Sequence, residues 1–120
     1  MNYFCDLERK SGEDLEQGAI WGMESEDLDC TLVAWSKGEG VAPHVNDEVD
    51  VLMVVMEGTV HVELPEEDRR LSEGQLLLIP KGILRRIESH SDRVVYINVH
   101  KRRRPLTLSG MESYPRRANE

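Results

Sequence analysis

The stretches GEGVAPHVNDEVDVLMVVMEG (residues 38–58) and GQLLLIPKGILR (residues 74–85) decide the fold of this 120-residue chain. The first follows the pattern Gly38-x5-His44-x-Asn46-x4-Val51-x6-Gly58, and the second follows Gly74-x5-Pro80-x-Gly82-x2-Arg85. Glycine permits sharp bends that other residues resist, and proline cannot donate a hydrogen bond to a neighbouring strand. The pattern therefore predicts short strands separated by tight turns, with Pro80 closing one strand and Gly58 forming a hairpin turn or a bend.

The rest of the chain repeats this alternation. Short apolar runs occur at residues 19–23, 31–35, 51–56, 59–64, 75–79, 83–87 and 93–99, and clusters rich in Gly, Pro, Ser and acidic residues separate them. Such spacing is typical of an all-β sandwich or barrel. We expect an N-terminal arm at residues 1–17 with a short helix or strand, a barrel at 18–100 and a basic C-terminal arm at 101–120.

The two spaced motifs resemble the signature motifs of the cupin family, over about residues 18–100. This resemblance implies a small single-domain double-stranded β-helix, or jelly-roll barrel, with a pocket inside. In a typical metal-binding cupin the first motif carries two His and a Glu, and the second carries one His. Only His44 stands at such a position here, while Asn46, Val51 and Arg85 occupy the other three. The resemblance therefore implies the family's barrel and argues against its usual metal centre.

Arg85 is the most informative of these replacements. A guanidinium group has five N–H donors, no lone pair for a metal and a permanent charge, so it repels a nearby cation. It is suited instead to bind a carboxylate or phosphate through two parallel hydrogen bonds. Because a buried charge needs a partner, two alternatives are open. One is an exchangeable small anion, with His44 and Asn46 as further donors, and the other is a carboxylate of the protein itself: Glu48, Asp50 or Glu63.

A metal site is the competing interpretation of the same region. His44 and Asn46 share one face if a regular strand runs through them, but a single imidazole is a weak ligand set, since zinc and iron sites use three or four donors. A bulge after Asn46 could turn a carboxylate inward. The alternative ligand set, for one divalent Fe, Mn, Ni or Zn ion, is His44 with Glu48, Asp50 or His100. Two other histidines are expected on the surface, His61 and His90.

Residues 51–56, VLMVVM, are apolar at both alternating positions. Both faces of this strand should therefore be covered. The barrel interior covers one face, and a second sheet, an arm or another subunit must cover the stripe of Leu52, Val54 and Met56. We predict a homodimer, because an uncovered stripe would be an exposed apolar patch.

Charge and composition limit the partners. The formal net charge is −8, yet residues 101–120 carry six basic side chains against two acidic ones, a net +4 that leaves −12 on the rest. An acidic body argues against general nucleic-acid binding. No apolar run reaches the roughly 18 residues of a membrane span, and the N-terminus lacks a signal-peptide pattern. Two isolated cysteines, Cys5 and Cys30, suit a reducing compartment, so we expect a cytoplasmic protein.

These observations lead to one main hypothesis. The protein is expected to bind a small anionic or polar metabolite in the barrel, without the usual cupin metal, through His44, Asn46 and Arg85. The alternative is a metal-dependent cupin enzyme of the dioxygenase or isomerase type, and a third hypothesis is a purely structural role. The sequence leaves open whether the protein is an enzyme, because this fold carries many unrelated functions.

Overall fold

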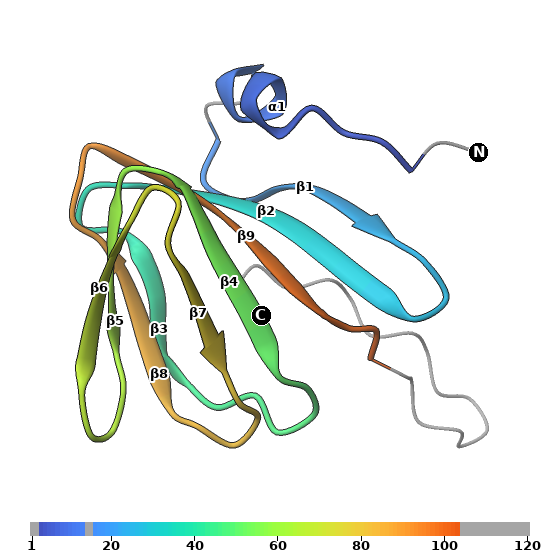
Figure 1. The fold of residues 1–120 in the computed structure, drawn as a ribbon. Coiled ribbons are helices and arrows are strands. Elements are labelled where there is room, and N and C mark those ends of the chain that lie inside the picture. The colour runs from blue at the N-terminus through green and yellow to red at the C-terminus, as the bar shows by residue number, and fades with distance from the viewer. Residues whose placement is uncertain (1–2, 14–15, 104–120) are drawn as a thin grey trace.

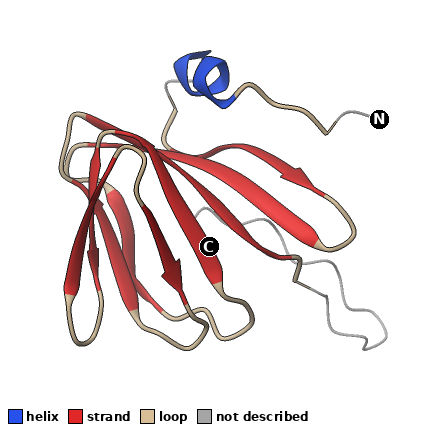
Figure 2. Ribbon diagram, in the orientation of Figure 1, coloured by secondary structure: helices blue, strands red, loops and turns tan. Residues whose placement is uncertain are grey.

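The computed structural model describes residues 3–13 and 16–103 (Figure 1). Figure 2 shows that strands make up most of this part of the chain, with one short helix at the N-terminal end. The elements, in chain order, are α1 (Leu7–Glu13), β1 (Gly18–Glu24), β2 (Leu28–Ser36), β3 (Gly40–His44), β4 (Val51–Glu57), β5 (Thr59–Glu63), β6 (Asp68–Ser72), β7 (Leu76–Ile79), β8 (Arg85–Ser89) and β9 (Arg93–Lys101).

The strands form two sheets. The larger has the order β1-β2-β9-β4-β7 and the smaller the order β3-β8-β5-β6, with antiparallel pairing throughout. Consecutive strands β4 and β5 belong to different sheets, and Gly58 between them has a φ of 77°. Gly58 therefore forms a bend that passes the chain from one sheet to the other. The fold is the double-stranded β-helix that the spaced motifs predict.

Alternating side chains of the two sheets meet in the barrel core. The buried apolar residues of this core come from both sheets: Val33, Met53, Val55, Val60, Val62, Leu71, Ile79, Ile87, Val94 and Tyr96. Within it the Trp35 Nε1–H group donates a hydrogen bond to the Tyr96 hydroxyl at 2.9 Å. Burial raises the pKa of Tyr96 well above its usual value, so the ring stays neutral and contributes to the core as an apolar group with one satisfied polar tip.

A second apolar cluster lies on the outer face of the larger sheet. It is built on Leu32, Ala34, Val95 and Ile97, and Leu7 of α1 packs against it. The Arg93 Nη2 group also donates a hydrogen bond to the Ser11 carbonyl at 3.0 Å, which ties the helix to the start of β9. Figure 1 shows α1 beside the β1 and β2 end of this sheet. The N-terminal arm thus contains a helix and covers part of the outer face, as one of the predicted alternatives requires.

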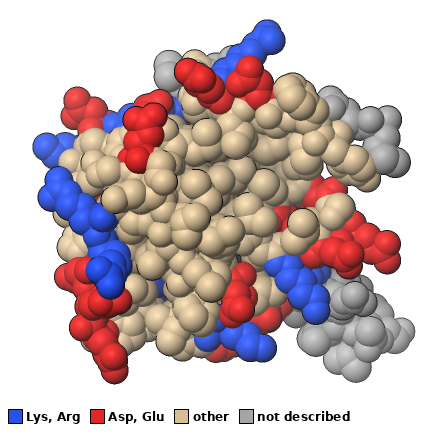
Figure 3. Space-filling model, in the orientation of Figure 1, with Lys and Arg blue, Asp and Glu red and all other residues tan. Residues whose placement is uncertain are grey.

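The cover is incomplete toward β7. Val54 and Met56 pack against the outer cluster, but Leu76 and Leu78, on the edge strand next to β4, are 61% and 56% exposed. Figure 3 shows a broad uncharged area on this face, with charged side chains toward its margins. The predicted homodimer stays a prediction.

Two strands lie outside the seven apolar runs of the sequence. One is β3, which ends at His44, and the other is β6, which has the sequence DRRLS and buries only Leu71. An edge strand can be this polar since one side faces solvent. The last strand also runs through Lys101, so the predicted arm boundary at residue 101 falls inside β9, and residues 104–120 of that arm lie outside the described residues. No helix among the described residues is long and apolar enough to cross a membrane.

Candidate functional site: a buried arginine at the end of the barrel

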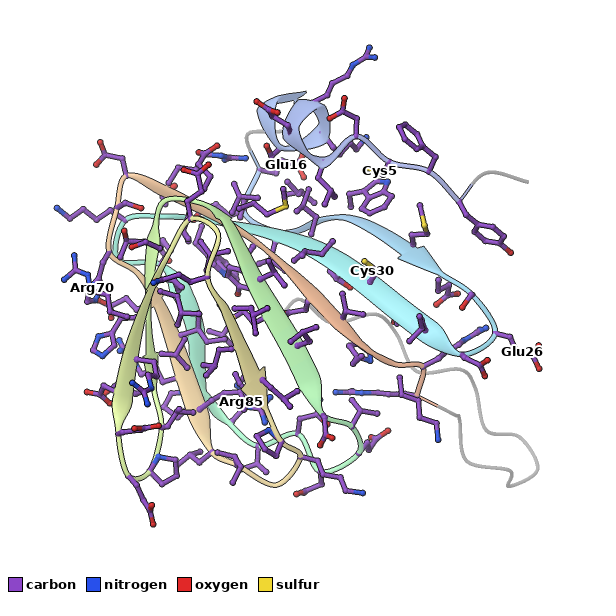
Figure 4. All side chains as sticks on the ribbon, in the orientation of Figure 1. Cys5, Glu16, Glu26, Cys30, Arg70 and Arg85 are labelled. Carbon is purple, nitrogen blue, oxygen red and sulfur yellow. The ribbon has the colours of Figure 1, made fainter. Side chains whose placement is uncertain are left out.

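Arg85 opens β8 and points into the barrel. Alternate residues of this strand are buried, so Arg85, Ile87 and Ser89 face inward while Arg86 and Glu88 face outward. Figure 4 places Arg85 between the sheets, near the end of the barrel where β7 leads into β8. Its exposed fraction is 0%, which makes it the largest fully buried side chain among the described residues. Because alternate residues of β8 face inward, the permanent charge of Arg85 lies in the barrel interior.

Backbone carbonyl groups, and not a carboxylate, hold this guanidinium. Arg85 Nε donates to the Ile83 carbonyl at 3.1 Å, and Nη2 donates to the carbonyls of Ile83 at 3.0 Å and Pro80 at 3.3 Å. The Nη1 atom is buried and has no hydrogen-bond partner among the described residues. Burial lowers the pKa of Arg85, and the positive charge of Arg103 lowers it further. Both effects disfavour the cation, so a negative charge placed here would be stabilised.

The expected carboxylate partners lie elsewhere. Glu63 pairs with Arg86 on the outer face, with 2.8 Å between Oε2 and Nη1. Asp50 is exposed and accepts a hydrogen bond from the Lys81 backbone N–H at 2.9 Å, and Glu48 is exposed as well. In the part of the chain that the structure describes, no ion pair includes Arg85. The alternative in which a carboxylate of Glu48, Asp50 or Glu63 pairs with Arg85 is therefore wrong.

His44 lies directly beside Arg85. It ends β3, and its Cα is the register partner of the Arg85 Cα across the β3–β8 ladder, after a bulge between Val41 and His44. Its Nδ1 atom is 3.0 Å from the Ala42 carbonyl oxygen. Because a carbonyl oxygen only accepts, Nδ1 carries the hydrogen in this contact, and in the neutral form of the ring Nε2 is then an acceptor. This Nε2 atom is buried, and no group in residues 3–13 or 16–103 forms a hydrogen bond with it.

Asn46 completes the predicted trio, although not on a strand. The expected regular strand ends at His44, and Asn46 lies in the following loop, where it is 4% exposed. Its Oδ1 atom accepts hydrogen bonds from the Glu48 and Val49 backbone N–H groups at 3.0 and 3.2 Å. Its own carbonyl accepts one from the Gly82 N–H at 2.8 Å. These bonds hold the loop against the turn before β8. The amide Nδ2 is buried and has no hydrogen-bond partner in the part of the chain that the structure describes.

The alternative metal ligands do not assemble. His100 is buried on the inner face of β9, with its Nδ1 atom 2.8 Å from the Lys101 carbonyl oxygen and its Nε2 atom 4.0 Å from Asp29. Glu48 and Asp50 are exposed, so no bulge turns them inward. Among the described residues, no three His, Cys, Asp or Glu side chains are grouped as a metal site.

The remaining histidines lie on the outer face of the smaller sheet. His61 and His90 form an edge-to-face ring pair with centroids 4.8 Å apart. Their Nε2 atoms lie 3.4 Å from Asp68 and Glu88, respectively. The sequence prediction that His61 faces away from the core is confirmed.

Two cavities adjoin the barrel edges. One of about 250 Å³ borders the Arg85 region and is lined by Pro43, Glu63, Leu64, Pro65, Leu84, Arg85 and Arg86. The other, of about 420 Å³, lies between the edge strands and is lined by Arg69, Arg70, Leu71, Gln75, Leu76 and Leu77. Of the three predicted site residues, Arg85 lines the first cavity, whereas His44 and Asn46 do not line it.

Sequence reasoning missed two features of this site. The first is that the Pro80 and Ile83 carbonyls accept hydrogen bonds from Arg85. Every residue has a backbone carbonyl, so residue types do not indicate which carbonyls will bind a side chain. The charge of Arg103 also reaches Arg85, although the basic run at 101–104 resembles an ordinary solvated strand end. The strand pairing explains this contact. β9 runs antiparallel to β2 and β4, so the last residues of β9 lie beside the first residues of those strands.

The sheet order and the inward-facing site define a cupin-type barrel. Residues 30–107 match the family described as AraC-like ligand-binding domain, and the chain belongs to this family. No curated protein matches the sequence.

Solved structures agree on the fold. The structure of KdgF from a Halomonas species is 27% identical, with a TM-score of 0.64, and the match covers 68% of this chain and 74% of that one. A cupin-2 domain protein from Shewanella frigidimarina is 20% identical, with a TM-score of 0.69 and coverage of 82% and 94%. The BH2720 protein of Bacillus halodurans reaches a TM-score of 0.76 at 13% identity, with coverage of 87% and 83%. The last two likenesses concern the fold alone.

Proposed function

We propose that this protein binds a small anionic metabolite inside the barrel, with Arg85 as the anchor of the negative charge. One observation carries the proposal: Arg85 is fully buried, its Nη1 atom has no partner, and no carboxylate of the described residues pairs with it. A buried cation without an anion costs several kcal/mol. A bound anion would remove that cost, and membership of a ligand-binding domain family supports an exchangeable ligand over a filled core.

The proposed binding needs no metal ion. A cation at the usual cupin position would meet the Arg85 guanidinium, which cannot coordinate it, and a single imidazole from His44. Elemental analysis of the untagged protein tests this part of the proposal. About one Fe, Mn, Ni or Zn per subunit, lost in a His44→Ala variant, would instead support the metal-dependent enzyme of the dioxygenase or isomerase type.

Acetate is a suitable probe for the anion site because it carries one carboxylate and no other polar group. Addition of acetate at constant ionic strength should raise the thermal midpoint of the wild-type protein, by mass action on the folded state. Arg85→Met should lose this response. Arg86→Met is the matched control, since Arg86 is the neighbouring residue but faces outward and pairs with Glu63 and Glu88. An equal response in wild type and Arg85→Met would refute the proposal.

A further inference from the structure

The hydrogens of Arg85 limit how a ligand can contact it. A guanidinium has five N–H hydrogens: one on Nε and two on each Nη atom. The three bonds to the Ile83 and Pro80 carbonyls use the Nε hydrogen and both Nη2 hydrogens. Only the Nη1 hydrogens remain, whereas a two-pronged contact with a carboxylate takes hydrogens from two nitrogens. The ligand therefore meets Arg85 through one nitrogen, and the expected pair of parallel hydrogen bonds is not available in this conformation.

The two other buried atoms without a partner, on Asn46 and His44, require opposite kinds of hydrogen-bond partner. Asn46 Nδ2 is a donor and requires an acceptor, whereas His44 Nε2 is an acceptor while its Nδ1–H is held by the Ala42 carbonyl. A carboxylate oxygen carries only lone pairs, so it can satisfy Asn46 but not the neutral ring of His44. A hydroxyl group satisfies both, because it donates one hydrogen bond and accepts others. A simple carboxylate would leave one buried acceptor unpaired.

The three open atoms belong to one small region. His44 and Arg85 are register partners, which places their Cα atoms about 4.5–5.5 Å apart. Asn46 follows two residues after His44, and its backbone bond to Gly82 holds it against the turn before β8. A ligand that reaches all three atoms is therefore short, with its hydroxyl close to its carboxylate.

We infer that the site takes a short 2-hydroxycarboxylate, with a carboxylate oxygen on Arg85 Nη1 and the hydroxyl between His44 Nε2 and Asn46 Nδ2. This inference rests on the proposed function, since it names the chemical class of the anion that Arg85 binds. Arg85 supplies the buried positive charge that selects the carboxylate.

Glycolate and acetate test the inference, because they differ by one hydroxyl group. Each is titrated into the full chain at constant ionic strength and neutral pH, and the dissociation constant is measured by calorimetry or by amide chemical shifts. The hydroxyl of glycolate satisfies the buried His44 Nε2 acceptor that acetate leaves unpaired, so glycolate should bind about tenfold tighter. His44→Asn should bring the glycolate affinity down to that of acetate, because asparagine offers a donor toward Ala42 but has no group at the Nε2 position. The acetate affinity should stay unchanged in that variant.

The outcomes separate the two proposals. Equal affinities for glycolate and acetate in the wild type, both lost in Arg85→Met, would overturn the hydroxyl inference and leave the anion site standing. The wild-type comparison decides this even if His44→Asn fails to fold. Binding of neither acid, or binding of both that Arg85→Met leaves intact, would overturn the proposed function and the hydroxyl inference with it.

Discussion

Replacement of Arg85 by methionine tests the energetics of the site without any ligand. Removal of the buried charge relieves a desolvation cost of several kcal/mol. The same change leaves the Pro80 and Ile83 carbonyls without their donors, at about 1–3 kcal/mol each. Methionine fills the space of the arginine stem with a flexible apolar chain. These effects oppose each other and are of similar size, so the free energy of unfolding should change by less than about 2 kcal/mol.

Urea unfolding in a buffer without small carboxylates or phosphate measures this change. Arg85→Lys supplies the sharper comparison, because lysine keeps the desolvated charge but lacks the planar fork that reaches both carbonyls. We expect Arg85→Lys to be less stable than Arg85→Met. A loss of more than about 4 kcal/mol in Arg85→Met, with Arg85→Lys close to wild type, would show that Arg85 is a structural clamp. That result would refute the reasoning that a ligand must compensate its charge.

Three further changes test the fold and its surface. Gly58→Ala should cost at least about 2 kcal/mol in urea unfolding, because φ is +77° and a Cβ atom would overlap a backbone carbonyl; Gly74→Ala, at a similar φ with open space around it, should cost clearly less. We propose that the apolar edge of β7 joins two copies, so Leu78→Lys should yield a monomer in sedimentation, and a wild-type mass of 13.7 kDa at high micromolar concentration would contradict this. The hydrogen bond from Arg86 lowers the pKa of Glu88 in the folded protein. The Glu88 carboxylate therefore stabilises the fold at pH values above its unfolded pKa of about 4.3, and this stabilisation is lost as the pH falls through the lower folded pKa. Glu88→Gln should flatten the acid side of the curve of unfolding free energy against pH, and an unchanged acid side would contradict this prediction.

Local chemistry explains why the fold was predictable. Glycines with positive φ at residues 38, 58, 74 and 82, together with Pro80 after β7, mark bends that few other residues could form. The spacing of these residues in the chain therefore predicts the barrel. The placement of His44 beside Arg85 was predictable for a related reason, since both residues stand at fixed intervals from those bends. β6 was not, because a solvent-facing edge strand buries too few side chains to leave an apolar pattern.

The sequence by itself determined the barrel framework, the absence of the usual ligands from three motif positions and the presence of a charged residue where a histidine is expected. Only the tertiary structure decided which groups meet. Glu63 and Arg86 are neighbours across β5 and β8, so Glu63 pairs with Arg86 on the outer face, and Arg85, one residue earlier, turns to two backbone carbonyls. Strand order and register decide which of the two arginines pairs with Glu63. Both depend on packing over the whole barrel, so they cannot be read from the residue types along the chain.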